Sequence, residues 1–160
     1  MDVFEFAMNV EEEGEKIYRE FARKSSDTGI RVIFNILADM EKEHYQIFSQ
    51  LKAQEPVLHK SAGLNPQVEK VLKWIKSYAN EIRIDTPQLE IYRQAMESEK
   101  KAAEFYLEKA KNEENSELKA ALEKIAAEEY SHYETLEDII AALSPDPIDI
   151  EDSNWSRMPT

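Results

Sequence analysis

The sequence predicts an all-α protein: an antiparallel four-helix bundle with a long crossover that carries a short extra helix between the second and third helices. Apolar residues recur every three or four positions over four long stretches, which is the period of an amphipathic helix. The composition agrees, since the 160 residues include only 3 Gly and 33% are charged. The four stretches form two similar pairs, so the bundle is expected to contain an internal repeat.

The boundaries follow from turn and capping signals. Residues 25–29 form the first expected turn, which includes Gly29, and a Thr86-Pro87 pair is the expected start of the third long helix. An apolar stripe over about residues 66–83 predicts the extra helix. The four long helices are expected over about residues 2–26, 30–54, 87–112 and 117–143.

A chain of this length is near the commonest size of one domain. We expect residues 1–143 to form the bundle, with repeated halves at about 1–54 and 87–143 and a crossover at 55–86. Residues 144–160 are acidic and unpatterned, and they are expected to form a C-terminal tail.

The charge and the missing residue types exclude several classes of function. A formal net charge of −13 argues against binding nucleic acid or an anionic membrane surface. The absence of Cys excludes disulfides, thiolate metal sites and a Cys nucleophile from these residues. The first residues do not resemble a signal peptide, and no apolar run is long enough to span a membrane. We therefore expect a cytoplasmic protein.

Six polar side chains interrupt the apolar stripes at the middle of the four long helices. One long helix of each pair carries a single Glu, and the other carries Glu-x-x-His; both features recur 88 residues later. Any one of these residues alone would be interpreted as a surface residue, but six at repeated positions indicate a site. The six are Glu11, Glu41, His44, Glu99, Glu129 and His132.

The positions of the six residues predict a two-metal site. At about 1.5 Å rise per residue, all six lie roughly 20–26 Å from the turn of their hairpin, so they can meet in one layer. Glu and His three residues apart face the same side of a helix. Buried carboxylates need compensating positive charge, and no Lys or Arg recurs on these stripes. Carboxylates and imidazoles without sulfur favour Fe(II) or Mn(II).

This arrangement resembles the ferritin-like di-iron carboxylate bundles. Within that group the chain is similar to the rubrerythrin family over about residues 1–143, through Ala-Met-Asn-Val-Glu at 7–11 with Tyr18, and Ala-Asp-Met-Glu-Lys-Glu-His at 38–44. The resemblance implies that the six residues ligate two iron ions per chain, with Mn also possible. It further implies that Glu41 and Glu129 bridge the ions and that the four Glu form the catalytic centre.

The chain departs from the rubrerythrin pattern at two points. Rubrerythrins usually carry a rubredoxin domain with four Cys, so electrons are expected to come from a separate donor protein such as a rubredoxin. Many also have a further Glu one turn after the ligand of the third long helix, where this chain has Ala102.

Three further residues are candidates to support the site. Ligating His residues usually donate their second nitrogen to a carboxylate or carbonyl group, and Glu128 is placed to accept from a His of a neighbouring helix. Its repeat partner is Met40, which cannot do so. Tyr18 and Tyr106 lie two turns after the single Glu residues. The resemblance implies that their hydroxyls donate to the ligand carboxylates, and packing in the core is the alternative.

The resemblance implies a non-haem di-iron oxidoreductase that reduces hydrogen peroxide in oxidative-stress defence. The sequence pattern gives no indication of a cleft of substrate size, which is consistent with a substrate as small as hydrogen peroxide. The alternatives are a ferroxidase or iron-storage protein that uses dioxygen, a manganese catalase-like enzyme, and a non-enzymatic helical module. A homodimer or small homo-oligomer is expected.

Overall fold

The structure, a computed structural model, describes residues 2–57, 65–82 and 84–144. These residues contain helices and no strands, so the predicted all-α class is confirmed. The long helices are α1 (Val3–Lys24), α2 (Thr28–Lys52), α4 (Thr86–Lys111) and α5 (Ser116–Leu143), and the crossover carries α3 (Pro66–Ser77) with a 3₁₀ turn at Ala79–Glu81.

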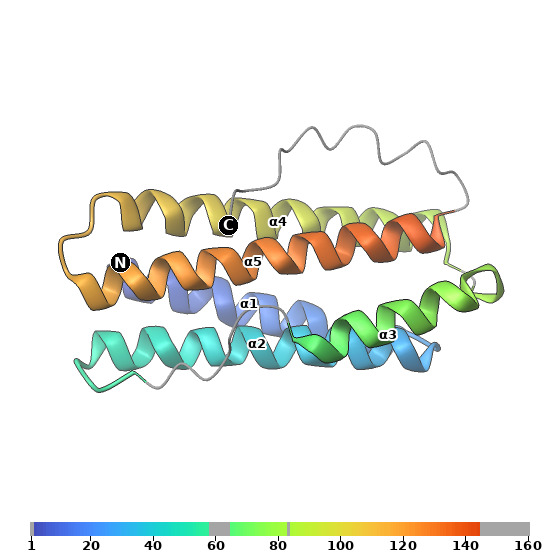
Figure 1. Cartoon of the computed structure of the whole chain (residues 1–160), viewed down its shortest axis with the longest axis horizontal. Coiled ribbons are helices and arrows are strands. Elements are labelled where there is room, and N and C mark those ends of the chain that lie inside the picture. Colours follow the sequence, from blue (N-terminus) through green and yellow to red (C-terminus); the bar gives the residue numbers. More distant parts are fainter. Residues whose placement is uncertain (1, 58–64, 83, 145–160) are drawn as a thin grey trace.

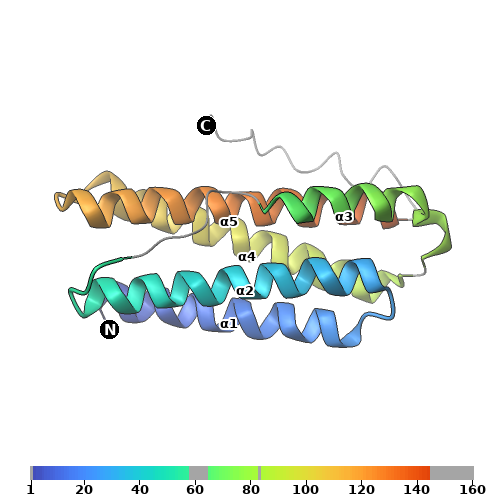
Figure 2. The same cartoon turned by 60° about the horizontal axis from the view of Figure 1, so that its bottom comes forward.

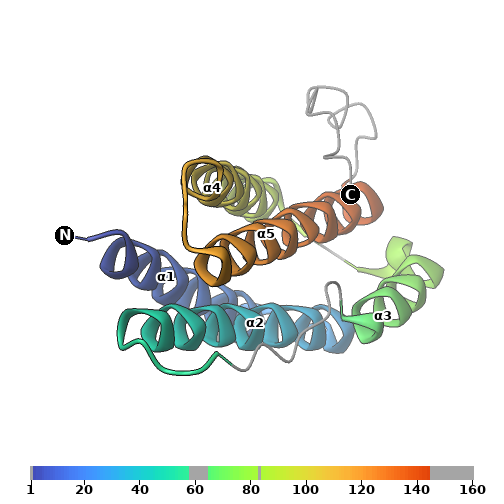
Figure 3. The same ribbon diagram turned by 60° about the vertical axis from the view of Figure 1, so that its left-hand side comes forward.

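The four long helices form two antiparallel hairpins, α1 with α2 and α4 with α5, which lie side by side (Figure 1). The crossover returns the chain along the bundle, so α4 starts at the end where α1 finishes (Figures 1 and 2). At this end α3 packs against α2 and α5, and the oblique view of Figure 3 shows it away from α1. This is the predicted bundle with its extra helix.

Asp and Asn side chains begin the helices by accepting hydrogen bonds from otherwise unpaired backbone N–H groups. Asp27 accepts from the Ile30 N–H at 2.9 Å and Asp85 accepts from the Gln88 N–H at 2.9 Å. As a result α2 starts at Thr28 rather than at residue 30, and Asp85 rather than Thr86 caps α4. The predicted boundaries were wrong by one or two residues here, because Asp27 and Asp85 cap the helices and each lies before the residue at which the helix was predicted to start.

Gly29 was predicted to lie in a turn, but it is buried within α2. A Cβ atom there would lie 2.9 Å from Ile75 Cγ1 and 3.0 Å from the Tyr78 hydroxyl. The glycine therefore allows α3 to approach α2 closely, and it marks a packing contact between helices instead of a break in the chain.

The extra helix is shorter than the predicted stretch 66–83, of which Arg83 lies outside the described residues. It ends at Ser77, whose hydroxyl donates to the Trp74 carbonyl at 2.5 Å. Tyr78 then leaves the helical conformation with φ −132°, and its hydroxyl donates to Asp27 at 3.3 Å. The apolar pattern continues beyond Ser77 because the 3₁₀ turn also packs against the core.

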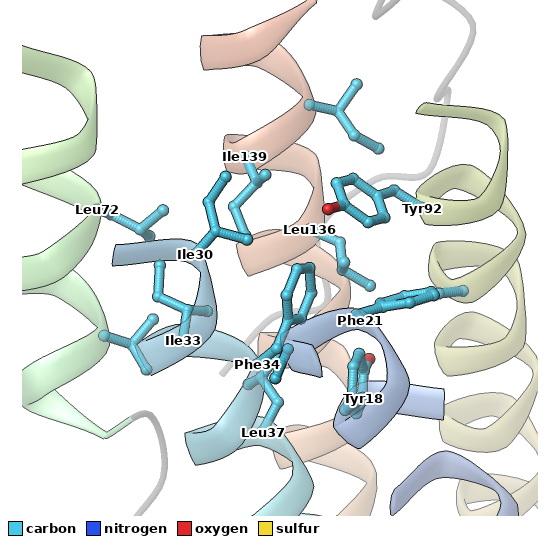
Figure 4. Packing of buried hydrophobic residues seen from close by; sticks show 14 of the residues in the cluster. Tyr18, Phe21, Ile30, Ile33, Phe34, Leu37, Leu72, Tyr92, Leu136 and Ile139 are labelled. Carbon is cyan, nitrogen blue, oxygen red and sulfur yellow. The ribbon is translucent and has the colours of Figure 1, made fainter. Parts of the chain in front are cut away.

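The core consists of two apolar clusters at different levels of the bundle. The first includes Tyr18, Phe34, Tyr92 and Leu136 together with the buried face of α3 (Figure 4). The second, nearer the chain's N-terminus, includes Phe48. In every long helix the candidate ligands lie between residues of the two clusters. The polar layer is therefore enclosed by apolar packing on both sides.

Within the described part of the chain, no helix combines the length and the hydropathy needed to cross a membrane. The predicted C-terminal tail lies outside the described residues except for Ser144. The division into a bundle over 1–143 and a tail stays a prediction.

Candidate metal centre

The structure brings all six predicted residues together in one layer. Each is at most 6% exposed, although all six carry polar side chains. One comes from α1, two from α2, one from α4 and two from α5. The level predicted from helix rise alone is therefore the level at which the side chains meet, and the layer comprises Glu11, Glu41, His44, Glu99, Glu129 and His132.

The six side chains divide into two groups, each able to offer four ligand atoms that lie within 4.8 Å of one another. His44 and Glu11 belong to one group, and His132 and Glu99 belong to the other. Glu41 and Glu129 belong to both groups. Two ions held in this layer would consequently share two carboxylates, which is the geometry of a bridged pair.

Both imidazole rings direct Nδ1 toward the carboxylates. His44 Nδ1 lies 2.7 Å from Glu129 Oε1, and His132 Nδ1 lies 3.0 Å from Glu41 Oε1. The rings stack with centroids 6.0 Å apart and planes inclined by 17°. The internal repeat of the sequence is thus also present in the geometry, with Nδ1 as the nitrogen available to each ion.

The other ring nitrogens have unequal partners. His44 Nε2 lies 2.8 Å from a carboxylate oxygen of Glu128, whereas His132 Nε2 lies 3.4 Å from the thioether sulfur of Met40. A carboxylate fixes the tautomer of an imidazole and raises its basicity as a ligand, while a thioether is a weak acceptor. The two ligand groups are therefore chemically different despite the repeat.

The variant Glu128→Met makes the two histidines equivalent, and we expect it to weaken metal binding at the His44 group by about 10–100-fold. Anaerobic titration with Fe(II) or Mn(II) measures the two affinities separately. The matched control is Met40→Leu, which keeps an apolar side chain beside His132 and should leave both affinities near those of the parent. Unchanged affinity in Glu128→Met would show that this carboxylate does not support the ligand.

Two buried tyrosines form hydrogen bonds between α1 and α4 at the site. The Tyr18 hydroxyl donates to Glu99 Oε1 at 2.5 Å, and the Tyr106 hydroxyl donates to Glu11 Oε1 at 2.8 Å. Burial, reinforced by the nearby carboxylates, raises the pKa of both phenols well above the ordinary value. Both tyrosines consequently stay neutral donors, and each orients the single Glu of the opposite hairpin.

Replacing either tyrosine by Phe, in Tyr18→Phe or Tyr106→Phe, removes a donor from a buried carboxylate. We expect a loss of roughly 1–3 kcal/mol in the metal-free protein, the usual result of leaving a buried polar group without its partner. We also expect a changed rate of oxidation of the reduced, iron-loaded protein. Chemical denaturation and stopped-flow absorbance measure the two effects, and unchanged oxidation kinetics in both variants would refute a role at the site.

Without cations the carboxylates in this layer repel one another. Burial raises the pKa of Glu41 and of Glu129 well above the ordinary carboxyl value, and the charge of Glu11 adds to both effects. Burial also acts on Glu99, but its hydrogen bond with Glu129 and the charge of His132 prevail and lower its pKa to about 2. Divalent cations would relieve this repulsion.

The donor set fits two such cations. No hydrogen-bond donor among the described residues reaches Glu99 Oε2, although this atom is buried. Carboxylate oxygens and imidazole nitrogens without sulfur suit iron or manganese. The residues present therefore fit a pair of divalent ions.

A groove of about 650 Å³ lies between α1 and α4 and reaches Glu41, Glu99 and Glu129. The expectation that the chain has no cleft of substrate size was therefore wrong. Helical periodicity reports which face of a helix is buried, but it does not report how far two helices stand apart. A sequence signal did exist, because Phe6, Val10 and Ile17 form a second apolar face of α1 beside the core stripe.

The family model described as rubrerythrin matches residues 2–140. The chain belongs to the rubrerythrin family. No match was found among curated proteins or among solved structures. As a rubrerythrin, the protein is ferritin-like and of the di-iron class, and its two buried Glu/His groups are able to hold metal.

Proposed function

We propose that this rubrerythrin is a non-haem di-iron oxidoreductase that reduces hydrogen peroxide to water in oxidative-stress defence. In this proposal Glu11, Glu41, His44 and Glu129 would hold one iron ion, and Glu41, Glu99, Glu129 and His132 would hold the other. Manganese could occupy the same ligands.

The observation that carries the proposal is the sharing of Glu41 and Glu129 between the two ligand groups. Splitting an O–O bond to water requires two electrons, and two ferrous ions held by these shared carboxylates would supply both at one place. A single-ion site could supply only one. The four carboxylates balance the four charges of two divalent ions.

The chain's own residues prepare the layer for this chemistry. The apolar clusters on both sides keep the six candidate ligands at most 6% exposed, which strengthens the electrostatic interactions within the layer. Tyr18 and Tyr106 hold Glu99 and Glu11 by hydrogen bonds, and Glu128 holds the ring of His44. The two bridging carboxylates keep their raised pKa only until cations replace their protons.

The proposal includes partners that complete the cycle. We propose that a separate electron-donor protein, such as a rubredoxin, reduces the centre, and that the protein is a cytoplasmic homodimer or small homo-oligomer.

The test compares hydrogen peroxide with dioxygen as oxidant of the anaerobically reduced, iron-loaded protein, followed by stopped-flow absorbance. We expect peroxide to oxidise the centre faster by orders of magnitude, with one peroxide consumed for every two ferrous ions. The matched controls are Glu99→Gln at the site and Glu12→Gln on the exposed face of α1. Only the first should lose the rapid phase.

Faster oxidation by dioxygen with continued consumption of added Fe(II) would overturn the proposal in favour of a ferroxidase or iron-storage role. Sustained release of oxygen from peroxide by the manganese-loaded protein would instead indicate a catalase-like role. Absence of metal binding would leave a non-enzymatic helical module.

A further inference from the structure

The groove between α1 and α4 has the properties of a ligand site. Its volume of about 650 Å³ falls within the range of roughly 300–1,000 Å³ that small-molecule pockets occupy. Its accessible lining is mostly apolar, although Glu13 and Lys101 also lie on it. Two of the apolar side chains, Phe6 and Ile17, are 42% and 39% exposed. At one end the rings of Phe6 and Phe105 meet with centroids 4.7 Å apart. A ligand that fits these walls has an apolar body.

The floor of the groove is formed by carboxylates of the metal site, and two small residues give access to them. A Cβ atom on Gly14 would lie 3.1 Å from Glu41 Oε2, so any larger residue there would crowd this carboxylate. Ala102 lines the groove from α4 at the position where many rubrerythrins carry a further Glu. The alanine therefore keeps the groove apolar down to the ligands.

We infer that the groove binds a neutral alkyl hydroperoxide, with its chain against α1 and α4 and its peroxide end at Glu41, Glu99 and Glu129. This inference rests on the proposed function and names a further substrate of the same site. Hydrogen peroxide has no apolar group that could pack against these walls. A net charge of −13 disfavours anionic amphiphiles, and Lys101 on the lining of the groove is accompanied by Glu13. We therefore take the ligand to be neutral.

A protein partner fits the groove less well. A stable interface covers roughly 800 Å² on each partner around an apolar centre. Of the large exposed apolar side chains in the described residues, only Phe6 and Ile17 lie at the groove. The groove is also a depression that leads to the carboxylates, whereas a flat face would suit a second copy better.

The reaction balances with the electron supply already proposed. The O–O bond of the hydroperoxide breaks, and the oxygen that remains on carbon takes a proton to give the alcohol. The other oxygen leaves as water after taking a second proton. The two electrons come from two ferrous ions, which become ferric and are reduced again by the donor protein.

Binding can be tested without turnover, on the oxidised, iron-loaded full chain. The probe is N-phenyl-1-naphthylamine, a neutral dye whose fluorescence rises in apolar sites, and the competitors are the primary alcohols from 1-butanol to 1-octanol, which are products of the inferred reaction. We expect saturable binding of the dye and competition that tightens by about fourfold for each added methylene, the value for burying one CH₂ group. No saturable binding, or no dependence on chain length, would overturn the inference.

Two exposed isoleucines provide a matched pair of variants. Ile17→Ser removes an apolar wall of the groove, whereas Ile91→Ser makes the same change at a 45% exposed position of α4 outside the groove. We expect Ile17→Ser to weaken alcohol binding by about tenfold and Ile91→Ser to match the parent. Equal binding by the two variants would refute the assignment. So would size-exclusion data in which Ile17→Ser dissociates a dimer, because a second copy would then cover the groove.

The kinetic test compares octyl hydroperoxide with hydrogen peroxide as oxidant of the reduced protein. Ala102→Leu fills the groove near its floor. We expect this variant to lower the ratio of the rate with octyl hydroperoxide to the rate with hydrogen peroxide by about tenfold or more, while Ile91→Ser keeps the ratio of the parent. If hydrogen peroxide reacts and octyl hydroperoxide does not, this inference fails and the proposed function stands. If neither reacts, the proposed function fails and the substrate assignment fails with it.

Discussion

Removal of both metal ions from the loaded protein is expected to lower its melting temperature by about 10–20 °C. A ligand at a hundred times its dissociation constant stabilises a protein by about 2.7 kcal/mol per site, and each kcal/mol shifts the melting temperature of a chain of this size by roughly 2–4 °C. Metal removal also leaves four carboxylates close together in an enclosed layer. The measurement is thermal unfolding with Fe(II) or Mn(II) and after chelation, without oxygen.

The metal-free protein should also depend on pH in a specific direction. Burial raises the folded-state pKa values of Glu41 and Glu129. Burial lowers the pKa of His44, but the charge of Glu11 and the hydrogen bonds to the carboxylates outweigh it, so this pKa is raised as well. A group with a raised folded pKa contributes stability that is present below its unfolded pKa and is lost as the pH rises through the folded pKa. Above pH 4.5, the ordinary carboxyl value, the metal-free protein should therefore become less stable as the pH increases.

The metal-loaded protein should show the opposite trend, since acid protonates the ligands and releases the ions. Glu12→Gln, on the exposed face of α1, is the control and should keep both trends. Equal melting temperatures with and without metal would contradict the two-metal site.

Glu41→Gln and Glu129→Gln are each expected to impair both metal positions, because each carboxylate belongs to both ligand groups. Glu11→Gln and Glu99→Gln should each impair one position, since these residues belong to one group each. Equilibrium dialysis with Fe(II) under anaerobic conditions gives the number of ions bound per chain. We expect about two ions per chain for the parent, about one for Glu11→Gln and Glu99→Gln, and close to none for Glu41→Gln and Glu129→Gln.

Glu41→Gln and Glu129→Gln should change the melting temperature in opposite directions with and without metal. Gln keeps the size of Glu but removes a charge from a crowded, buried layer, and such a replacement is often neutral or stabilising. Without metal, Glu41→Gln should therefore melt at or above the temperature of the parent, and with metal it should melt below it. Loss of only one ion in Glu41→Gln, as in Glu99→Gln, would show that this carboxylate is not shared.

The candidate ligands could be predicted from sequence because the layer is set by two regular quantities. Helix rise fixes the level of Glu11 and Glu41 relative to the turn between them, and helical period fixes the face of Glu41 and His44. The 88-residue repeat extends this reasoning to the second half. The position of Glu128 opposite His44 could also be inferred, because a residue adjacent to Glu129 on α5 faces the neighbouring helix.

Other features depend on the distances between helices, and the apolar periodicity of the sequence gives no information about these distances. The burial of Gly29 against Ile75 depends on how closely α3 approaches α2. The groove depends on the separation of α1 and α4 at Gly14 and Ala102. The helix α3 ends where Tyr78 leaves the helical conformation, and an apolar stripe that continues past this residue does not reveal that change.

The most direct test of the two-metal site is anomalous X-ray scattering at the iron edge from crystals of the reduced, iron-loaded protein. The account predicts two iron peaks in each chain, one beside His44 Nδ1 and one beside His132 Nδ1, with Glu41 and Glu129 between them. A single peak, or none among these six side chains, would contradict it.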